Sequence, residues 1–217
     1  MMQHFTSQIG YWNSVATEKR FSHPLRLHWL ARYASQQARI LDYGCGYGRT
    51  LAELSETGYK HVFGVDFSER MLERSRFQVP FSKVVRNDGQ HLSFKDDCFD
   101  VVLLFAVLTC IPDSNAQRRL LAETERALRP GGLIYVSDLL VNSDLRNRKR
   151  YQQFAETYGC YGVFELAEGI VVRHHEREWM EKITSSFEQL EFEPFMVTTM
   201  NGNLSSAFQY LGRKQRR

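Results

Sequence analysis

The sequence predicts an α/β fold built around a mostly parallel β-sheet. From residue 38 to residue 140, short apolar segments of strand length alternate with longer segments of helical periodicity, which is the pattern of β-α-β units. The run 101–108 is apolar at every position, as expected for a parallel strand covered by helices on both faces. Near the C-terminus, Asn201-Gly202-Asn203 joins two β-like segments and predicts an antiparallel hairpin that completes the sheet.

The composition is that of an ordinary globular protein. The chain has 217 residues, 43% of them hydrophobic, and a formal net charge of +3. This length allows one domain with or without a small addition, and so small a charge gives no argument for a nucleic acid partner. No apolar run approaches the roughly 18 residues of a membrane span, so we expect neither a membrane partner nor a signal peptide. The four cysteines form no Cys-x-x-Cys pair, which predicts reduced thiols, a cytoplasmic location and no metal site.

The first half of the chain supplies the N-terminal helices and three strands. His23-Pro24 interrupts the helical spacing of residues 1–37, which predicts two short helical pieces and then a longer helix from about residue 24 to residue 35. The next elements are a strand at 38–43, a helix at 49–58, a strand at 61–66, a helix at 68–78 and a strand at 83–88. Ser68 is the predicted N-cap of the helix at 68–78, and Phe77 is among its predicted inward side chains.

The second half continues the alternation and then departs from it. We expect a strand at 100–108, a helix at 114–132 capped by Asp113 or Ser114, and a strand at 133–140. The remaining predicted elements are a helix at 144–159, two short β pieces within 162–175, an amphipathic helix at 176–190, and strands at 191–200 and 206–214.

A glycine-rich loop carries the sharpest local signal. Residues 44–48 read Gly-Cys-Gly-Tyr-Gly between a strand and a helix. A dinucleotide fingerprint would need glycine where the chain has Arg49, which disfavours an NAD-dependent oxidoreductase, and the Gly-Lys-Ser/Thr of a P-loop is absent. The loop favours close backbone approach to a ligand without a diphosphate. The N-terminus of the next helix can hold a carboxylate, and Asp42 at the strand end suits an ammonium group.

Three successive strands each end in an aspartate. Asp66 follows the second strand and can accept both hydroxyls of a ribose, and Asp88 follows the third strand, where it can accept an exocyclic amine. A single aspartate in such a place is more often a helix cap or a solvated loop residue. Three of them at consecutive strand ends, beside the glycine loop, indicate a binding site.

This constellation resembles the class I S-adenosylmethionine-dependent methyltransferases. The resemblance runs from about residue 39 to residue 140, and the matching segments are ILDYGCGYGR, GVDFSERML, RNDG, FDVVLLFAVL and LRPGGLIYVSD. It implies a three-layer Rossmann-like sandwich whose seven-stranded sheet is mostly parallel with an antiparallel last strand. It also implies S-adenosylmethionine as cofactor and S-adenosylhomocysteine as product. The implied organisation is a helical lid at 1–37 and a methyltransferase domain at 38–217, with 141–175 as an insertion on the substrate side.

The resemblance implies roles for ten residues. The glycine loop would contact the methionyl part of the cofactor through Asp42, Gly44, Cys45 and Gly46. After the second strand, Asp66 would bind the ribose and Phe67 would lie beside the adenine, and after the third strand Asp88, with Gly89 next to it, would bind the adenine amine. After the fourth strand, Phe105 and Ala106 would contact the cofactor amine.

No catalytic base stands out. The candidates are His23, His174, Tyr11 and Asp138, followed by His175 and Tyr158. His23 is equally explained as a turn residue before Pro24, and adjacent histidines on a strand cannot both face one pocket. Tyr11 and Trp12 are better explained as packing of the lid over the cofactor.

The sequence limits the identity of the methyl acceptor only by excluding some classes of acceptor. Residues 105–108 read Phe-Ala-Val-Leu, where family members that methylate adenine or glutamine amides carry an Asn/Asp-Pro-Pro-Tyr-like tetrapeptide. Family members that methylate cytosine carry a Pro-Cys nucleophile, whereas Cys110 precedes Ile111-Pro112. The sequence therefore favours methyl transfer to an O, N or C atom of a small molecule. The alternatives are a non-catalytic cofactor-binding partner or regulatory subunit, and an RNA or protein methyltransferase that recognises its substrate through 141–175. The oligomeric state is not specified.

Overall fold

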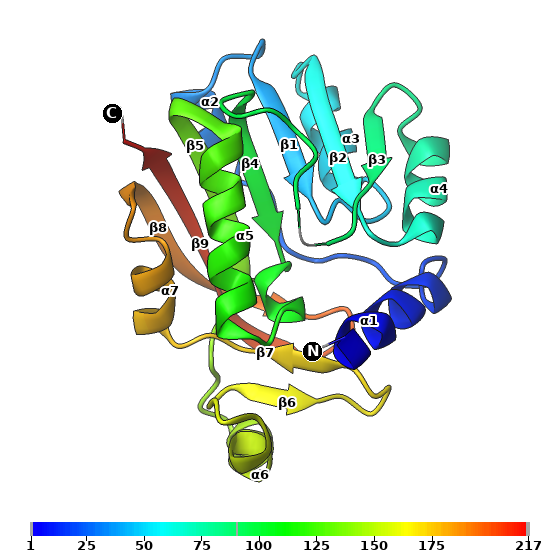
Figure 1. The fold of residues 1–217 in the computed structure, drawn as a ribbon, viewed down its shortest axis with the longest axis vertical. Helices are drawn as coiled ribbons and strands as arrows, with labels where there is room; N and C mark the ends of the chain where they lie inside the picture. The colour runs from blue at the N-terminus through cyan, green and yellow to red at the C-terminus, as the bar shows by residue number, and fades with distance from the viewer. Residues whose placement is uncertain (1, 90, 216–217) are drawn as a thin grey trace.

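A seven-stranded sheet forms the centre of the molecule in the computed structural model, which describes residues 2–89 and 91–215 (Figure 1). The strands lie in the order β3-β2-β1-β4-β5-β9-β8. The first five are mutually parallel, whereas β9 runs antiparallel to both β5 and β8. The predicted mostly parallel sheet with an antiparallel last strand is confirmed. The strands are β1 Arg39–Tyr43, β2 His61–Asp66, β3 Lys83–Arg86, β4 Phe99–Phe105, β5 Leu128–Leu139, β8 Phe187–Thr198 and β9 Leu204–Lys214.

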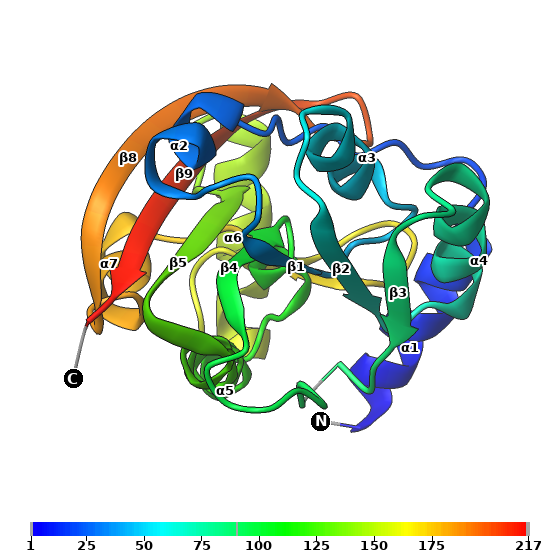
Figure 2. The same ribbon diagram turned by 90° about the horizontal axis from the view of Figure 1, so that it is seen from above.

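Helices cover both faces of this sheet and make the three predicted layers (Figures 1 and 2). Neighbouring residues of β4 point to opposite faces, so Leu104 packs with the α5 and α7 side and Leu103 with the α2, α3 and α4 side. Both residues are fully buried, which explains the apolar run that the sequence shows there. The helices are α1 Met2–Ser14, α2 Leu27–Tyr33, α3 Arg49–Glu56, α4 Glu69–Gln78, α5 Ser114–Ala127, α6 Leu145–Tyr158 and α7 Arg177–Ile183.

The predicted helix caps are present. The Ser68 hydroxyl accepts a hydrogen bond from the Met71 amide at 3.2 Å, and the Asp113 carboxylate accepts one from the Ala116 amide at 2.7 Å. Phe77 was expected to face inward, which is wrong: its side chain is 88% exposed on the last turn of α4.

Several helix boundaries differ from those predicted, because tertiary contacts end or delay the helices. Residues 2–14 hold one helix, α1, rather than two short pieces. Helix α2 begins only at Leu27, because the Pro24 carbonyl accepts a hydrogen bond from the Gln209 side chain at 2.5 Å. The helix expected at 114–132 ends at Ala127, since Leu128 already pairs with Phe99 of β4. The helix expected at 176–190 is only the seven residues of α7, because the chain from Phe187 onward pairs with β9.

Residues 141–175 lie beyond the carboxyl ends of the parallel strands; their role as a substrate-side insertion stays a prediction, and we call this segment the insertion. It contains α6 and a two-stranded antiparallel sheet of β6 (Val163–Glu165) and β7 (Val171–Arg173), as predicted (Figure 1). The N-terminal helix α1 reaches this insertion, because the Gln8 amide donates a hydrogen bond to the Val171 carbonyl at 2.9 Å. The division into a lid at 1–37 and a domain at 38–217 stays a prediction, and residues 1, 216 and 217 lie outside the described residues.

Among the described helices, none is long and apolar enough to cross a membrane.

Candidate active site

A cavity of about 1030 Å³ opens at the carboxyl ends of the parallel strands. Asp42, Asp66 and Phe105 line it from the ends of β1, β2 and β4. Trp12 of α1 lines it from the N-terminal segment, and Met200 from the β8–β9 turn. Ligand sites in open α/β sheets lie at this edge, and the volume is at the upper end of the range for small-molecule sites.

The glycine loop folds back onto β2 in a conformation that requires glycine. Gly44 and Gly46 have φ angles of 72° and 53°. A Cβ atom on Gly44 would lie 2.8 Å from the Val107 side chain, and one on Gly46 would lie 2.1 Å from the Phe21 ring. The Gly44 amide donates to the Val65 carbonyl at 2.8 Å, which fixes the loop against the neighbouring strand. The loop therefore leaves a narrow floor over which a ligand can approach the backbone.

Asp66 joins that loop to the end of β2. Its carboxylate accepts hydrogen bonds from the Gly46 amide at 2.9 Å and from the Ser68 amide at 2.8 Å. Burial raises the pKa of Asp66 to about 6, although these backbone hydrogen bonds act in the opposite direction. The carboxylate is thus held in place on the cavity wall with capacity to accept further hydroxyl donors.

Asp42 and Arg49 put opposite charges at the other side of the loop. Burial raises the pKa of Asp42 to about 7, while the Arg49 guanidinium lowers it. Arg49 stands at the first position of α3, forms an ion pair with Glu53 at 2.5 Å, and donates to the His23 carbonyl at 2.6 Å. A buried carboxylate and a guanidinium at a helix N-terminus can together bind the ammonium and carboxylate groups of an amino acid.

Comparisons with known proteins identify a methyltransferase domain in the chain. Residues 41–136 match the family model described as a methyltransferase domain. Ubiquinone biosynthesis O-methyltransferase from Aromatoleum aromaticum is 30% identical over 148 residues, which cover 64% of this chain and 61% of that protein. Phthiotriol/phenolphthiotriol dimycocerosates methyltransferase from Mycobacterium tuberculosis is 34% identical over 110 residues, 49% of this chain and 40% of that protein. This chain thus spans less than half the length of the mycobacterial relative.

A solved structure has the same fold. The S-adenosylmethionine-dependent methyltransferase from Methanosarcina mazei aligns with a TM-score of 0.83 at 24% sequence identity, over 90% of this chain and 100% of that one.

The chain therefore contains a methyltransferase domain at residues 41–136, and its fold is that of the S-adenosylmethionine-dependent methyltransferases.

The site fits S-adenosylmethionine, the cofactor of the methyltransferases that share this fold. The glycine loop gives a floor without side chains, Asp66 offers a carboxylate suited to ribose hydroxyls, and Asp42 with Arg49 suits the amino and carboxylate groups of the methionyl part. When bound, the cofactor supplies a methyl group on a positively charged sulfur.

The structure brings most of the predicted cofactor residues to the cavity wall, namely Asp42, Gly44, Cys45, Asp66, Phe67, Gly89, Phe105 and Ala106. Gly46 stays behind the wall and acts through its hydrogen bond to Asp66. Asp88 is turned toward His91: its carboxylate accepts from the His91 amide at 2.8 Å and lies 3.1 Å from the imidazole Nδ1. Asn87 and His91 line the cavity in this region instead.

Of the candidate bases, His23 is the one on the cavity wall. Its Nδ1 is 2.9 Å from the Ser137 hydroxyl, and its ring meets the Phe195 ring edge to face. Burial, assisted by the Arg49 charge, lowers the pKa of His23 to about 4. The imidazole is therefore neutral at physiological pH.

The other candidates lie in packed surroundings away from the cavity. His174 is buried in the insertion with the Tyr151 hydroxyl 2.6 Å from its Nδ1, and His175 contacts the Gln117 side chain at 2.9 Å. Asp138 is fully buried and accepts from the backbone amides of Thr109 and Leu139. Burial raises its pKa to about 7.

Neither tyrosine candidate lines the cavity. Tyr11 packs edge to face on Trp12, and burial raises its pKa to about 12. Tyr158 lies at the end of α6 in the insertion.

Sequence reasoning missed several lining residues that come from distant segments. These are Gln8 and Phe21 before the first strand, Arg49 after the glycine loop, Thr109 in the short helix η1 (Leu108–Cys110), and Thr199 and Met200 in the β8–β9 turn. Arg49 had a usable signal, since it is the first residue of the helix that follows the loop. The others have no local pattern, because only the tertiary fold brings them to the sheet edge. No cluster of metal-ligating side chains occurs among residues 2–89 and 91–215.

Proposed function

We propose that this protein transfers the methyl group of S-adenosylmethionine to an O, N or C atom of a small-molecule acceptor. The observation that carries the proposal is a single cavity with two kinds of lining. Asp42 and Asp66 line it beside the glycine loop, which we assign to the cofactor. Trp12, His23, Leu139 and Met200 also line it, and we assign this part to the acceptor and call it the acceptor end. The cavity has room for a nucleoside-containing cofactor and an apolar acceptor together.

The surroundings of the acceptor end favour a small apolar molecule over a macromolecule. The N-terminal helix α1 covers this end, and Gln8 ties it to β7 of the insertion. A helix placed over the cavity in this way limits the space for a nucleic acid strand. The two relatives, a ubiquinone biosynthesis O-methyltransferase and a phthiotriol/phenolphthiotriol dimycocerosates methyltransferase, support a small-molecule acceptor.

His23 is the side chain we assign to the acceptor. Three hydrogen bonds fix the backbone around it: Arg49 donates to the His23 carbonyl, Gln209 to the Pro24 carbonyl, and the Arg26 amide to the Tyr135 hydroxyl. With Nδ1 occupied by Ser137, Nε2 is the nitrogen left to accept a proton from a hydroxyl or amine. A neutral imidazole also avoids repelling the cationic sulfur of the cofactor.

We place the protein in a reducing compartment such as the cytoplasm. All four cysteines are unpaired, and desolvation raises the pKa of the buried Cys45 thiol and of the partly buried Cys110 thiol.

Calorimetric titration with S-adenosylmethionine and S-adenosylhomocysteine tests the cofactor site. We expect micromolar binding of both by the wild type and at least a tenfold loss in Asp66→Ala. Asp88→Ala is the matched control, because its carboxylate points to His91, and should weaken binding less. A screen of small hydroxylated and aminated metabolites would follow. Absence of binding to the wild type would contradict the proposal, and binding without any methyl transfer would favour the non-catalytic partner.

A further inference from the structure

The connection between α4 and β3 exposes aromatic side chains to solvent. Phe77 and Phe81 are 88% and 67% exposed, the largest values among the exposed large apolar residues of the described chain. Phe77 lies on the last turn of α4 and Phe81 in the short connection to β3. Water-exposed rings placed so close together mark an interaction surface more often than chance exposure does.

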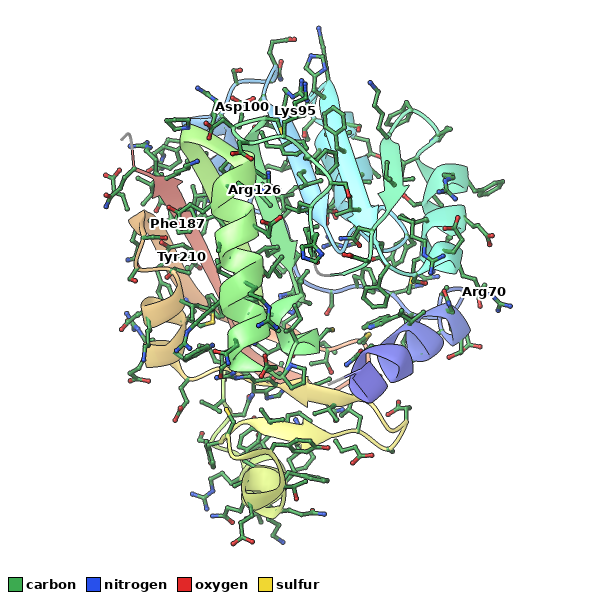
Figure 3. The ribbon with its side chains drawn as sticks, in the orientation of Figure 1. Arg70, Lys95, Asp100, Arg126, Phe187 and Tyr210 are labelled. Atoms are coloured by element: carbon green, nitrogen blue, oxygen red, sulfur yellow. The ribbon has the colours of Figure 1, made fainter. Side chains whose placement is uncertain are left out.

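Positive charge is concentrated around these rings. Residues 69–86 contain five Lys or Arg and two Glu, a local excess of +3 in a chain whose net charge is +3, and Arg76 forms an ion pair with Glu69 at 2.7 Å. Arg74 is turned inward onto the Tyr47 ring, 3.9 Å from its centroid. The other four cations are exposed, and Arg70 projects outward from α4 (Figure 3). We call Arg70, Arg76, Phe77, Phe81, Lys83 and Arg86 the α4–β3 patch.

The patch lies at the outside of the fold. β3 is the edge strand of the sheet, and its connection from α4 lies at the periphery, at the end of β3 opposite the carboxyl edge (Figures 1 and 2). The cavity opens at the carboxyl edge, and Phe77 and Phe81 lie at the opposite end of β3. Arg70 at the start of α4 and Arg86 at the end of β3 extend the patch toward the carboxyl edge, so a partner leaves the cavity free when it is centred on Phe77 and Phe81.

We propose that the α4–β3 patch docks the protein on an anionic lipid surface. Two exposed rings can enter the boundary between headgroups and acyl chains while the surrounding cations face lipid phosphates. No membrane span is needed for such reversible adsorption. The prediction from the sequence that the protein has no membrane partner rested on the lack of a span, so this proposal revises it.

Charge argues against the other occupants of this surface. A two-fold pair of chains joined through the patch would bring two groups of four exposed cations together. Single-stranded nucleic acid binds in grooves that track its backbone, whereas Phe77 and Phe81 lie at a peripheral turn. An anionic lipid surface offers acyl chains to the two rings and phosphates to the cations.

Vesicle co-sedimentation of the full chain tests this proposal. We expect the wild type to sediment with vesicles of phosphatidylglycerol and phosphatidylcholine, to bind pure phosphatidylcholine at least tenfold more weakly, and to be released by salt. Phe77→Ser/Phe81→Ser and, separately, Arg76→Gln/Lys83→Gln should each weaken binding at least tenfold. Met196→Ser/Leu204→Ser is the matched control, because these residues are 55% and 63% exposed on the opposite edge of the sheet. This control should bind as the wild type does.

The outcomes separate the occupants. A wild type that stays in the supernatant with anionic vesicles overturns the proposal, as does a Phe77/Phe81 variant that binds normally. Equal binding to neutral vesicles removes the role of the cations and also overturns it. A dimer seen by light scattering, or an RNA complex seen by gel shift, that disappears in the Phe77/Phe81 variant assigns the surface to that partner instead. Because all substituted side chains are exposed, thermal unfolding should be unchanged in every variant, and cofactor affinity should be unaffected.

Discussion

The Gly46 amide and the Asp66 carboxylate are joined by a hydrogen bond of 2.9 Å across the ends of two neighbouring strands. This bond makes the glycine loop and the residue assigned to the ribose one rigid unit. Movement of either would misplace the other, so the two most recognisable features of the sequence are also mechanically coupled.

Cofactor affinity should fall as the pH is lowered from 8 to 5. The pKa values of Asp42 and Asp66 are raised by burial to about 7 and about 6, so both carboxyls become protonated in this range. The protonated forms lose their attraction for an ammonium group and for hydroxyl donors, which costs up to about tenfold in affinity per pH unit for each group. Calorimetry at four pH values measures the slope. Asp66→Asn should show the shallower dependence of Asp42 alone, and a flat wild-type profile would refute the assignment of both carboxylates.

Asp42→Asn should stabilise the cofactor-free protein at pH 8. The folded-state pKa of Asp42 lies above its unfolded value, so its contribution to stability is largest below the unfolded pKa and is lost as the pH rises through about 7. Removing the buried charge should raise the free energy of unfolding by about 1–4 kcal/mol at pH 8 and by less at pH 5. Urea unfolding at the two pH values measures this difference. A variant that is destabilised equally at the two pH values would show that burial is not the main cause of the raised Asp42 pKa.

Gly46→Ala should destabilise the protein more than Gly169→Ala does. Both glycines have positive φ angles, of 53° and 78°, so each alanine carries a backbone cost of about 1 kcal/mol. Only at Gly46 does the new Cβ meet a neighbour, the Phe21 ring at 2.1 Å, whereas nothing lies within 4 Å at Gly169. The steric conflict should cost about 1–3 kcal/mol more and should also displace Phe21 from the cavity wall. Thermal unfolding of the two variants compares them, and equal losses would mean that Phe21 moves freely.

His23→Gln should slow methyl transfer by about 10²–10⁴ while leaving the affinity for S-adenosylhomocysteine unchanged, if the acceptor is a hydroxyl or amine. Ser137→Ala should have a smaller effect, because it removes only the hydrogen bond that orients the imidazole. The lowered pKa of His23, about 4, means that its protonation does not reduce activity between pH 6 and 8. Single-turnover rates and calorimetry separate transfer from binding. His28→Gln is the control, and a His23→Gln enzyme at full rate would exclude the base role.

Hydrogen exchange of the N-terminal segment should slow when S-adenosylhomocysteine binds. The Asn13 side chain accepts a hydrogen bond from Ser68, the residue two positions after Asp66, and Arg74 donates to the Ala16 carbonyl. Ordering of the Asp66 region by the cofactor should therefore hold the segment 8–22 more tightly over the cavity. Mass spectrometry with and without ligand measures the change, with α6 as an internal reference. Unchanged exchange in 8–22 would contradict closure.

Local patterns in the sequence predicted the framework of the site. The strand ends, the glycine loop and the caps at Ser68 and Asp113 depend on residues near one another in the chain, and the structure confirms the sheet and the caps. Three predicted helices were too long, since sheet pairing of Leu128 and Phe187 and the Pro24–Gln209 hydrogen bond override helical periodicity.

The acceptor side could not be predicted in the same way. His23 is at the cavity because Arg49, Ser137 and Gln209, which are far apart in sequence, hold its segment there. The sequence offered His174 as a candidate beside His23, although His174 lies on a predicted β piece and His23 precedes a proline. Both are buried, but only the tertiary contacts bring His23 to the cavity and pack His174 against Tyr151 in the insertion.

The long edge strand β8 bears on the solubility of the protein. An unprotected strand of twelve residues at a sheet edge is a template for aggregation with other chains. Here Pro194 removes one backbone donor, and Glu191 and Glu193 put carboxylates along the strand, where they bind Arg32 and Arg26 at 2.6 Å and 2.7 Å. These ion pairs draw the α2 segment toward the edge. Replacing the two glutamates with valine would leave the cavity untouched and yet convert this side of the protein into a nucleus for fibrils.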